Sequence, residues 1–166
     1  MRSYRLPLLI VSALVILADR LSKLWVNKHI RVGSHIDVIH GVFQISHVMN
    51  TGAAFSLFEN LPSVAVRYGL IAFSVIAIGI VGTMLWITAR ALTMTSTALA
   101  LILGGALGNL YDRVHLHYVI DFLAVRIIHY DWPDFNVADS CICIGAALLV
   151  LEMFRSSDTS ATKETA

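Results

Sequence analysis

Apolar residues fall into four long runs that are separated by more polar connections. The runs are Leu6–Val26, Val66–Thr88, Thr95–Val114 and Val137–Phe154. A helix needs about 20 mostly apolar residues to cross the hydrocarbon core of a bilayer. The pattern therefore predicts four transmembrane helices. Only the second run is nearly free of internal charge, and the other three carry polar residues toward one end.

The segment between the first two runs alternates between apolar and polar residues. Ile36 and Val38 precede Gly41, and Val42–Val48 alternates after it. Period two with β-branched residues around a central glycine is typical of a short, twisted hairpin. Irregular backbone cannot face lipid. We therefore expect this hairpin at or above the membrane interface.

The remaining connections complete a single domain. Residues 53–59 are expected to form a short interfacial helix, with Phe55 and Phe58 toward lipid. Helices two and three are joined by a short turn, and helices three and four by a longer loop over residues 115–136. We expect residues 1–155 to form one membrane domain. Residues 156–166, rich in Ser and Thr, are expected to be a disordered cytoplasmic tail.

Composition agrees with lipid as the solvent. The chain is 57% hydrophobic and 14% charged, whereas soluble domains are roughly half apolar and a quarter charged. Its net charge of +1 gives no basic surface for nucleic acid. Cys141 and Cys143 lie one residue apart in an apolar run. That spacing favours small buried hydrophobes over a disulfide or a metal site.

The N-terminus resembles a secretory signal peptide, with two arginines before an apolar run. No small-residue cleavage motif follows, and the chain continues through Asp19, Arg20 and Lys23. We therefore interpret it as an uncleaved first helix. Four spans put both termini on one side. Only short segments lie on that side, which predicts that it is cytoplasmic.

Polar residues gather at one depth when the helix directions are applied. Ionisable groups inside a membrane are costly and indicate function. All of these residues fall near the outer interface: Asp19, Lys23, Asn50, Asn109, Asp112, Arg113, Asp121, Asn136 and Asp139. The sequence therefore predicts one polar layer at the outer face.

Two carboxylates in such a layer share a proton, so one acts as a base and the other as an acid. That arrangement activates water for amide hydrolysis. Asp121 and Asp139 suit this role, because both lie beside apolar residues near the outer face. Asp112 is a competing partner, although Arg113 beside it favours an ion pair or a helix-end role. Asp19 and Lys23 share a helix face and can pair.

Other chemistries fit less well. The histidines show no H-E-x-x-H pattern and are interpreted as interfacial polar contacts. Ser140 and Cys141 have no neighbouring histidine to activate them. A proton-coupled transporter would place acids near the midplane, often with internal repeats, and a non-catalytic scaffold would not need this polar layer. We expect no metal and no cofactor.

Five motifs in order resemble the lipoprotein signal peptidase family, also called signal peptidase II. They are D-R-L-S-K at Asp19–Lys23, N-T-G-A-A-F-S at Asn50–Ser56, G-G-A-L-G-N-L-Y-D-R at Gly104–Arg113, V-I-D-F at Val119–Phe122 and F-N-V-A-D at Phe135–Asp139. The resemblance implies an all-α membrane fold of four transmembrane helices. It adds an extracytoplasmic β-cradle and a short interfacial helix.

The resemblance also implies roles for the motif residues. Asp121 and Asp139 would be catalytic. Asn109 and Arg113 would bind the substrate backbone, and Asn50 and Asn136 would line the same pocket. A supporting role falls to Asp19, Lys23, Asp112, Gly52, Gly105 and Gly108.

The implied activity is aspartyl endopeptidase cleavage in the bacterial inner membrane. The substrate would be a prolipoprotein carrying diacylglyceryl on a cysteine, cut just before that cysteine. The active site would lie near the periplasmic face, in contact with membrane lipid. Globomycin-type cyclic peptides would inhibit it.

Overall fold

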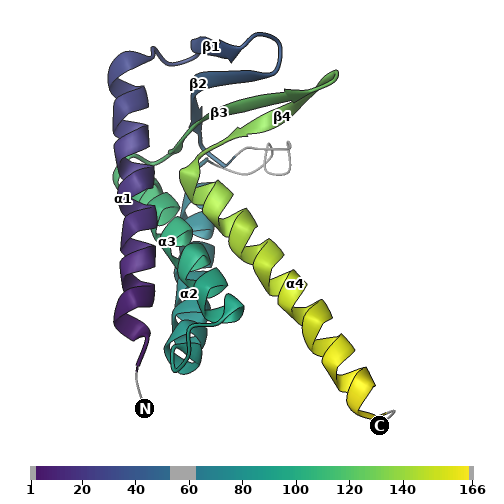
Figure 1. The fold of residues 1–166 in the computed structure, drawn as a ribbon. Helices are drawn as coiled ribbons and strands as arrows, with labels where there is room; N and C mark the ends of the chain where they lie inside the picture. The colour runs from purple at the N-terminus through teal and green to yellow at the C-terminus, as the bar shows by residue number, and fades with distance from the viewer. Residues whose placement is uncertain (1–2, 53–62, 165–166) are drawn as a thin grey trace.

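Four helices and four strands make up the part of the chain that the computed structural model describes, residues 3–52 and 63–164 (Figure 1). In chain order they are α1 Arg5–His29, β1 His35–Ile39, β2 Phe43–Asn50, α2 Ser63–Thr88, α3 Met94–His115, β3 Val119–Ile127, β4 Tyr130–Phe135 and α4 Val137–Glu164.

The sheet lies at one end of the helices, and both chain termini lie at the other end (Figure 1). Helix α3 is central and packs against α1, α2 and α4. Glycines permit this close packing. A Cβ on Gly104 would lie 2.7 Å from the Ser12 carbonyl oxygen, and one on Gly105 would lie 2.4 Å from that of Ala138. The helices therefore pack closely around α3.

Apolar side chains are distributed as expected for a protein surrounded by lipid. A buried cluster near the termini joins α1, α2 and α3 through Leu8, Leu85, Leu99 and Leu103. Many large apolar residues instead point outward. Among the described residues, three helices are long and apolar enough to cross a membrane, namely Val64–Thr88, Met94–His115 and Val137–Arg155.

Helix α1 is not one of these three, although it is 25 residues long. It carries Asp19, Arg20 and Lys23 in its second half, whereas each of the other three helices has an 18-residue stretch with at most two charged residues. Its outer face is nonetheless apolar, with Leu14 and Leu21 both 58% exposed. The structure thus contains the four expected helices, and three of them qualify as candidate spans.

The sheet is antiparallel throughout, in the order β1-β2-β3-β4. The predicted hairpin is confirmed as β1 and β2, with Gly41 at φ +73° in the turn. The expectation of a loop over residues 115–136 is wrong, because β3 and β4 fill most of it. Strand β3 begins with four buried residues, so its sequence does not alternate as a half-exposed strand would.

Two further expectations concern the ends of elements. Helix α4 continues to Glu164, beyond the predicted end at Phe154 and into residues expected to form a disordered tail. The division into a domain and a tail stays a prediction. The expected interfacial helix at residues 53–59 lies outside the described residues.

Candidate functional site

The pairing of β2 with β3 brings Asn50 to Asp121. Val48 lies opposite Asp121, and Asn50 is two residues further along β2. Asn50 Nδ2 donates to Asp121 Oδ2 at 2.9 Å. The Asn50 carboxamide is itself oriented, because its Oδ1 accepts from the Gly52 backbone N–H at 2.8 Å. Gly52 has a φ of +89°, which glycine adopts without the strain that other residues would incur.

The start of α4 positions Asp139. Asn136 directly precedes the helix, and its Oδ1 accepts from the Asp139 backbone N–H at 2.9 Å. In return, Asp139 Oδ2 accepts from the Asn136 backbone N–H at 3.3 Å. This reciprocal pair has the form of a capping box. It fixes the Asp139 carboxylate at the positive end of the helix dipole.

Asn136 connects the two carboxylates. Its Nδ2 donates to Asp121 Oδ1 at 2.7 Å, while its Oδ1 caps Asp139. Asn109 on α3 adds a second amide, whose Nδ2 donates to Asp139 Oδ1 at 2.7 Å. We refer to Asp121, Asp139, Asn50, Asn109 and Asn136 as the acid–amide cluster. Among the described residues, each hydrogen-bond donor to its carboxylates is a neutral amide.

Burial changes the proton affinity of this cluster. Asp121 is 3% exposed and Asn136 is fully buried. Burial raises the pKa of Asp121 to about 6. The hydrogen bonds from Asn50 and Asn136 lower that pKa, and the charge of Asp139 raises it. A carboxyl with this pKa exchanges a proton near neutral pH, as general acid–base catalysis requires.

A second polar group lies beside the first, and we refer to Asp19, Arg20, Lys23 and Asp112 as the ion-pair cluster. Lys23 Nζ lies 2.8 Å from Asp19 Oδ2 and 2.9 Å from Asp112 Oδ2. The other carboxylate oxygen of Asp112 pairs with Arg20, whose guanidinium lies over the Tyr111 ring. Asp19, Lys23 and Asp112 are fully buried.

The predicted pairing of Asp19 with Lys23 is confirmed. The ion pair considered between Asp112 and Arg113 is replaced by one from α1, because Arg20 lies close enough to pair with Asp112. Sequence reasoning gave Arg20 no role. Its position in the D-R-L-S-K motif, one residue after Asp19, is the signal that could have identified it.

The ion-pair cluster contacts the first turn of α4 and one residue of the acid–amide cluster. Asp19 Oδ1 accepts from the Ala138 backbone N–H at 3.1 Å, and Lys23 Nζ donates to Asn109 Oδ1 at 3.1 Å. Gly108 leaves the room for this approach, because a Cβ there would lie 2.7 Å from Asp19 Oδ2. The buried charges thereby tie α1 to α3 and to the first turn of α4.

Arg113 lies on α3 close enough for its charge to interact with Asp139, Asp121 and Asp112. It is partly exposed. Within residues 3–52 and 63–164, its guanidinium forms no side-chain hydrogen bond or ion pair. Its five donors are therefore available to a molecule that enters beside the carboxylates.

His47 and Ser140 form other contacts. His47 is buried and makes a polar contact, with Nδ1 2.7 Å from the Ile30 carbonyl oxygen. Ser140 Oγ donates to the Asn136 backbone carbonyl at 2.9 Å. In the described part of the chain, no three or more His, Cys, Asp or Glu side chains are grouped as metal ligands.

Comparisons with known proteins agree with one family. Residues 11–155 match the family described as Signal peptidase (SPase) II. A lipoprotein signal peptidase of Alteromonas mediterranea is 42% identical over 160 residues, which cover 95% of this chain and 85% of that protein. Another, of Ectopseudomonas mendocina, is 42% identical over 159 residues, or 93% of this chain and 92% of that protein.

Solved structures show the same fold. One, described as a bacterial membrane enzyme, aligns with a TM-score of 0.81 at 25% identity and covers 92% of this chain and 90% of that chain. A second with the same description has a TM-score of 0.79 at 26% identity, over 89% of this chain and 92% of that chain.

Proposed function

Because the chain belongs to the signal peptidase II family of aspartic proteases, which process lipoprotein precursors in bacterial membranes, we propose how it performs this reaction. It removes the signal peptide from prolipoproteins that carry diacylglyceryl on a cysteine, and it cuts just before that cysteine. Asp121 and Asp139 are the catalytic pair.

The observation that carries this proposal is the Asn136 side chain, which hydrogen-bonds Asp121 and caps Asp139. The two carboxylates are thereby held together with neutral partners, in a buried site where the pKa of Asp121 is raised to about 6. Such a pair holds one proton between two groups. That is the state an aspartic protease needs.

Hydrolysis then follows from the shared proton. The ionised carboxylate takes a proton from water as the water oxygen attacks the peptide carbonyl carbon. The protonated carboxyl gives its proton to the carbonyl oxygen. As the C–N bond breaks, the carboxyl that took the water proton gives it to the leaving amine nitrogen, and the other carboxylate takes back a hydroxyl proton from the intermediate. No metal or cofactor enters this scheme.

Arg113 holds the substrate in this scheme. It has no side-chain partner in the described residues, so its donors can bind peptide carbonyls near the cut. The side-chain amides of Asn109 and Asn136 are buried and bonded to Asp139 and Asp121, so they orient the carboxylates instead of the substrate, and Asn50 completes this side of the pocket. An unwound peptide presents its carbonyls, whereas a helical signal peptide hides its amide bonds.

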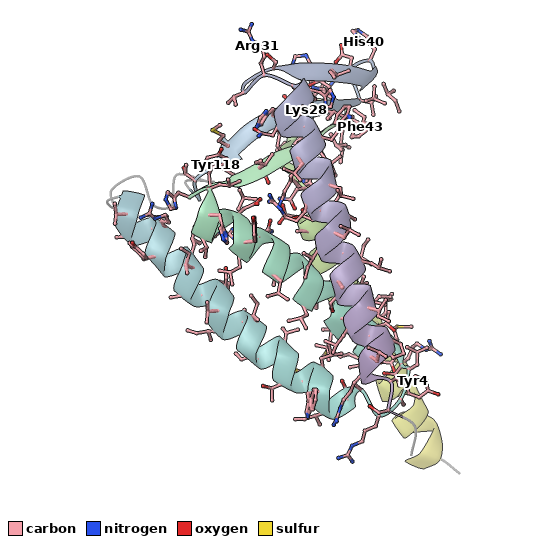
Figure 2. All side chains as sticks on the ribbon, turned by 90° about the vertical axis from the view of Figure 1, so that its left-hand side faces the viewer. Tyr4, Lys28, Arg31, His40, Phe43 and Tyr118 are labelled. Atoms are coloured by element: carbon pink, nitrogen blue, oxygen red, sulfur yellow. The ribbon has the colours of Figure 1, made fainter. Side chains whose placement is uncertain are left out.

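In this proposal the site lies at the outer face of the membrane. All four cross the bilayer, with both termini in the cytoplasm and the sheet outside. For α1 the support is its length and its exposed leucines. Tyr4 lies at one end of the helices and Lys28 and Arg31 at the other, beside the sheet (Figure 2). The diacylglyceryl chains would stay in lipid, anchoring the cysteine at the depth of the carboxylates.

The experiment that tests this proposal uses purified protein and one prolipoprotein with and without diacylglyceryl. Mass spectrometry of the products is expected to place the cut directly before the cysteine in the lipidated form. The unmodified form is expected to remain intact. Globomycin is expected to block the reaction, and EDTA is expected to leave it unchanged.

Three results would contradict it: equal cleavage of both forms, a cut at another bond, or loss of activity with EDTA that added metal restores. The last result would reopen the histidines as ligands. Proton transport in vesicles without any peptide cleavage would instead favour the transporter alternative.

A further inference from the structure

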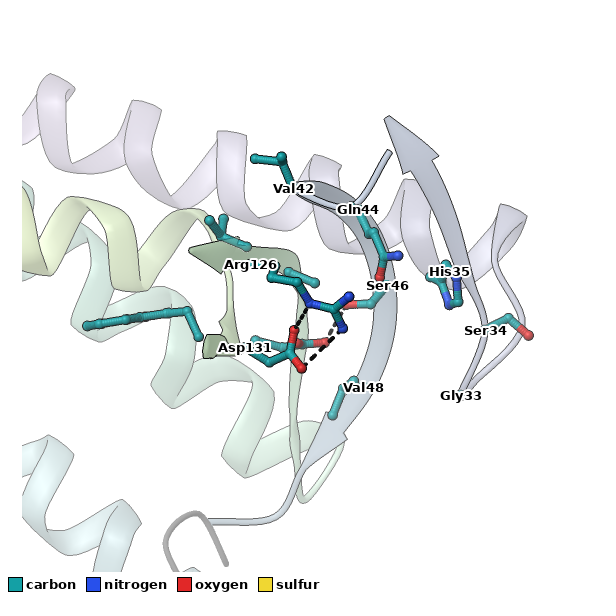
Figure 3. A pocket seen from close by; sticks show the side chains of 14 residues that line it. Gly33, Ser34, His35, Val42, Gln44, Ser46, Val48, Arg126 and Asp131 are labelled. Atoms are coloured by element: carbon teal, nitrogen blue, oxygen red, sulfur yellow. Dashed lines mark hydrogen bonds and ion pairs between the residues drawn. The ribbon is translucent and has the colours of Figure 1, made fainter. Parts of the chain in front are cut away.

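A cavity of about 260 Å³ lies on the sheet, away from the ion-pair cluster. Its lining includes Gln44, Ser46 and Val48 from β2, and Ala124, Arg126 and Asp134 from β3 and β4. Gln44, Ser46 and Val48 follow one another along β2, with Arg126 and Asp131 beside them (Figure 3). The cavity is far larger than the roughly 30 Å³ that one water occupies in the liquid.

This cavity reaches the strand pair that includes Asp121. Side chains of directly opposed residues in an antiparallel pair lie on the same face. Val48 is opposite Asp121, and Val48 lines the cavity. The cavity therefore begins beside the catalytic carboxylate, and it extends past a register shift between Ile45 and Val48 to the pair of Gln44 with Ala124.

The lining includes two carboxylates, Asp131 and Asp134. Asp134 Oδ2 accepts from Ser46 Oγ at 2.5 Å, and Asp131 is paired with Arg126 at 2.5 and 3.2 Å. A carboxylate has about four acceptor positions, so both retain unused capacity. Two carboxylates and one guanidinium leave the lining acidic, which favours a ligand with N–H groups or positive charge.

The direction in which the substrate chain runs indicates which segment of it would occupy the cavity. If the signal peptide lies among the helices, the chain beyond the cut must leave on the sheet side, since the sheet covers that end of the helices (Figure 1). An extended chain advances about 3.3 Å per residue. From Asp121 it passes Val48 within one or two residues and reaches Ser46 and Asp134 roughly two residues later.

We propose that this cavity binds the substrate segment roughly two to five residues after the lipidated cysteine. It holds that segment extended and favours polar or basic side chains over acidic ones. This inference rests on the proposed function and extends the substrate contacts beyond the cleaved bond.

The test compares two lipidated substrates, one ending directly after the cysteine and one continuing for eight residues with lysine at the third and fourth positions. For the wild-type protein, the longer substrate is expected to have a KM at least fivefold lower. Asp134→Asn is expected to reduce this advantage at least threefold. Ala124→Phe, which fills the cavity without changing charge, is expected to do the same if Asp134→Asn does not fold.

The matched control is Glu152→Gln, which makes the same charge change near the far end of α4, at a partly exposed residue that does not line the cavity. It is expected to keep the full KM difference. Replacing the two lysines of the substrate by glutamates is expected to abolish the advantage.

Equal KM values for the two substrates in the wild-type protein, with cleavage intact, would overturn this inference alone. An unchanged KM difference in both cavity variants would overturn it equally. Absence of cleavage of both substrates would instead count against the proposed function.

Discussion

The two polar clusters contain two aspartates each, but they differ in what surrounds those aspartates. In the ion-pair cluster, Asp19 and Asp112 have cationic partners in Lys23 and Arg20. In the acid–amide cluster, Asp121 and Asp139 receive hydrogen bonds from neutral asparagines. A cation compensates a buried carboxylate charge in place, whereas neutral amides leave the carboxyl able to exchange its proton.

This difference separates a structural role from a catalytic one at almost the same depth in the molecule. Burial alone does not indicate catalysis, because Asp19 and Asp112 are more buried than Asp121. The charge of the hydrogen-bond partners decides whether a buried aspartate is structural or able to exchange its proton. Each of the following predictions changes the partners, the charge or the helix packing around these clusters and measures whether activity or stability responds.

Asp121→Asn is expected to have the largest effect on activity. It keeps the shape of the side chain and removes the proton exchange, so kcat is expected to fall about 10³-fold, within the range for general acid–base groups. The melting temperature in detergent is expected to change by only a few degrees. Activity above a tenth of the wild-type value would show that Asp121 is not part of the catalytic pair.

Lys23→Met is expected to have the largest effect on stability. It leaves Asp19 and Asp112 buried with one cation between them, and breaking a buried pair costs about 3–5 kcal/mol. Thermal unfolding of the purified protein measures this loss. Lys28→Met, an exposed residue on the same helix, is the control and is expected to have little effect. Equal stability of the two variants would contradict the bracing role.

Asn50→Ala is expected to lower kcat/KM by about 10- to 100-fold, because a hydrogen bond to a charged group contributes about 1.5–3 kcal/mol. It also changes the pH profile. Activity that needs one shared proton falls as the pH rises through the pKa of Asp121, which is about 6. Asn50 lowers that pKa, so removing it moves the alkaline limb to higher pH.

The pH dependence of kcat/KM for wild type and Asn50→Ala measures this shift, and the apparent pKa belongs to the pair of carboxyls. Asn27→Ala, at an exposed position on α1, is the matched control. If the alkaline limb of the Asn50→Ala profile stays in place or moves to lower pH, the hydrogen bond from Asn50 does not lower the pKa of Asp121.

Gly105→Ala is expected to have the smallest effect, a destabilisation of about 1–3 kcal/mol from overpacking. The new Cβ would lie 2.4 Å from the Ala138 carbonyl oxygen and would force α3 away from α4. Gly82→Ala on α2 is the control, because a Cβ there meets nothing within 4 Å. Equal melting temperatures of the Gly105→Ala and Gly82→Ala variants would contradict the close packing of α3 on α4.

The sequence predicted much of the fold because membrane helices carry a strong local signal. Apolar runs gave the four helices, and alternation around Gly41 gave the first hairpin. Strand β3 was missed because its residues at Val119–Phe122 are buried on both faces, so their sequence does not alternate between apolar and polar residues. Its place in the sheet depends on pairing with β2, which is distant in sequence.

The sequence predicted which residues form the candidate site, but it did not predict which of them contact one another. Spacing and depth brought the polar residues to one layer, and the motifs distinguished Asp121 and Asp139 from the other aspartates. That Asn136 bridges the pair, and that Arg20 pairs with Asp112, depends on three helices and a sheet meeting in space. Separations of 92 residues, as between Arg20 and Asp112, leave no local pattern.

One comparison tests the central claim most directly: kcat per folded molecule and melting temperature for Asp139→Asn beside Asp112→Asn. Both make the same chemical change at buried or partly buried aspartates. We predict that Asp139→Asn loses about 10³-fold in kcat with its melting temperature nearly unchanged. Asp112→Asn should lose melting temperature and less than tenfold in kcat. The reverse pattern, or equal losses in both, would contradict the assignment of the two clusters.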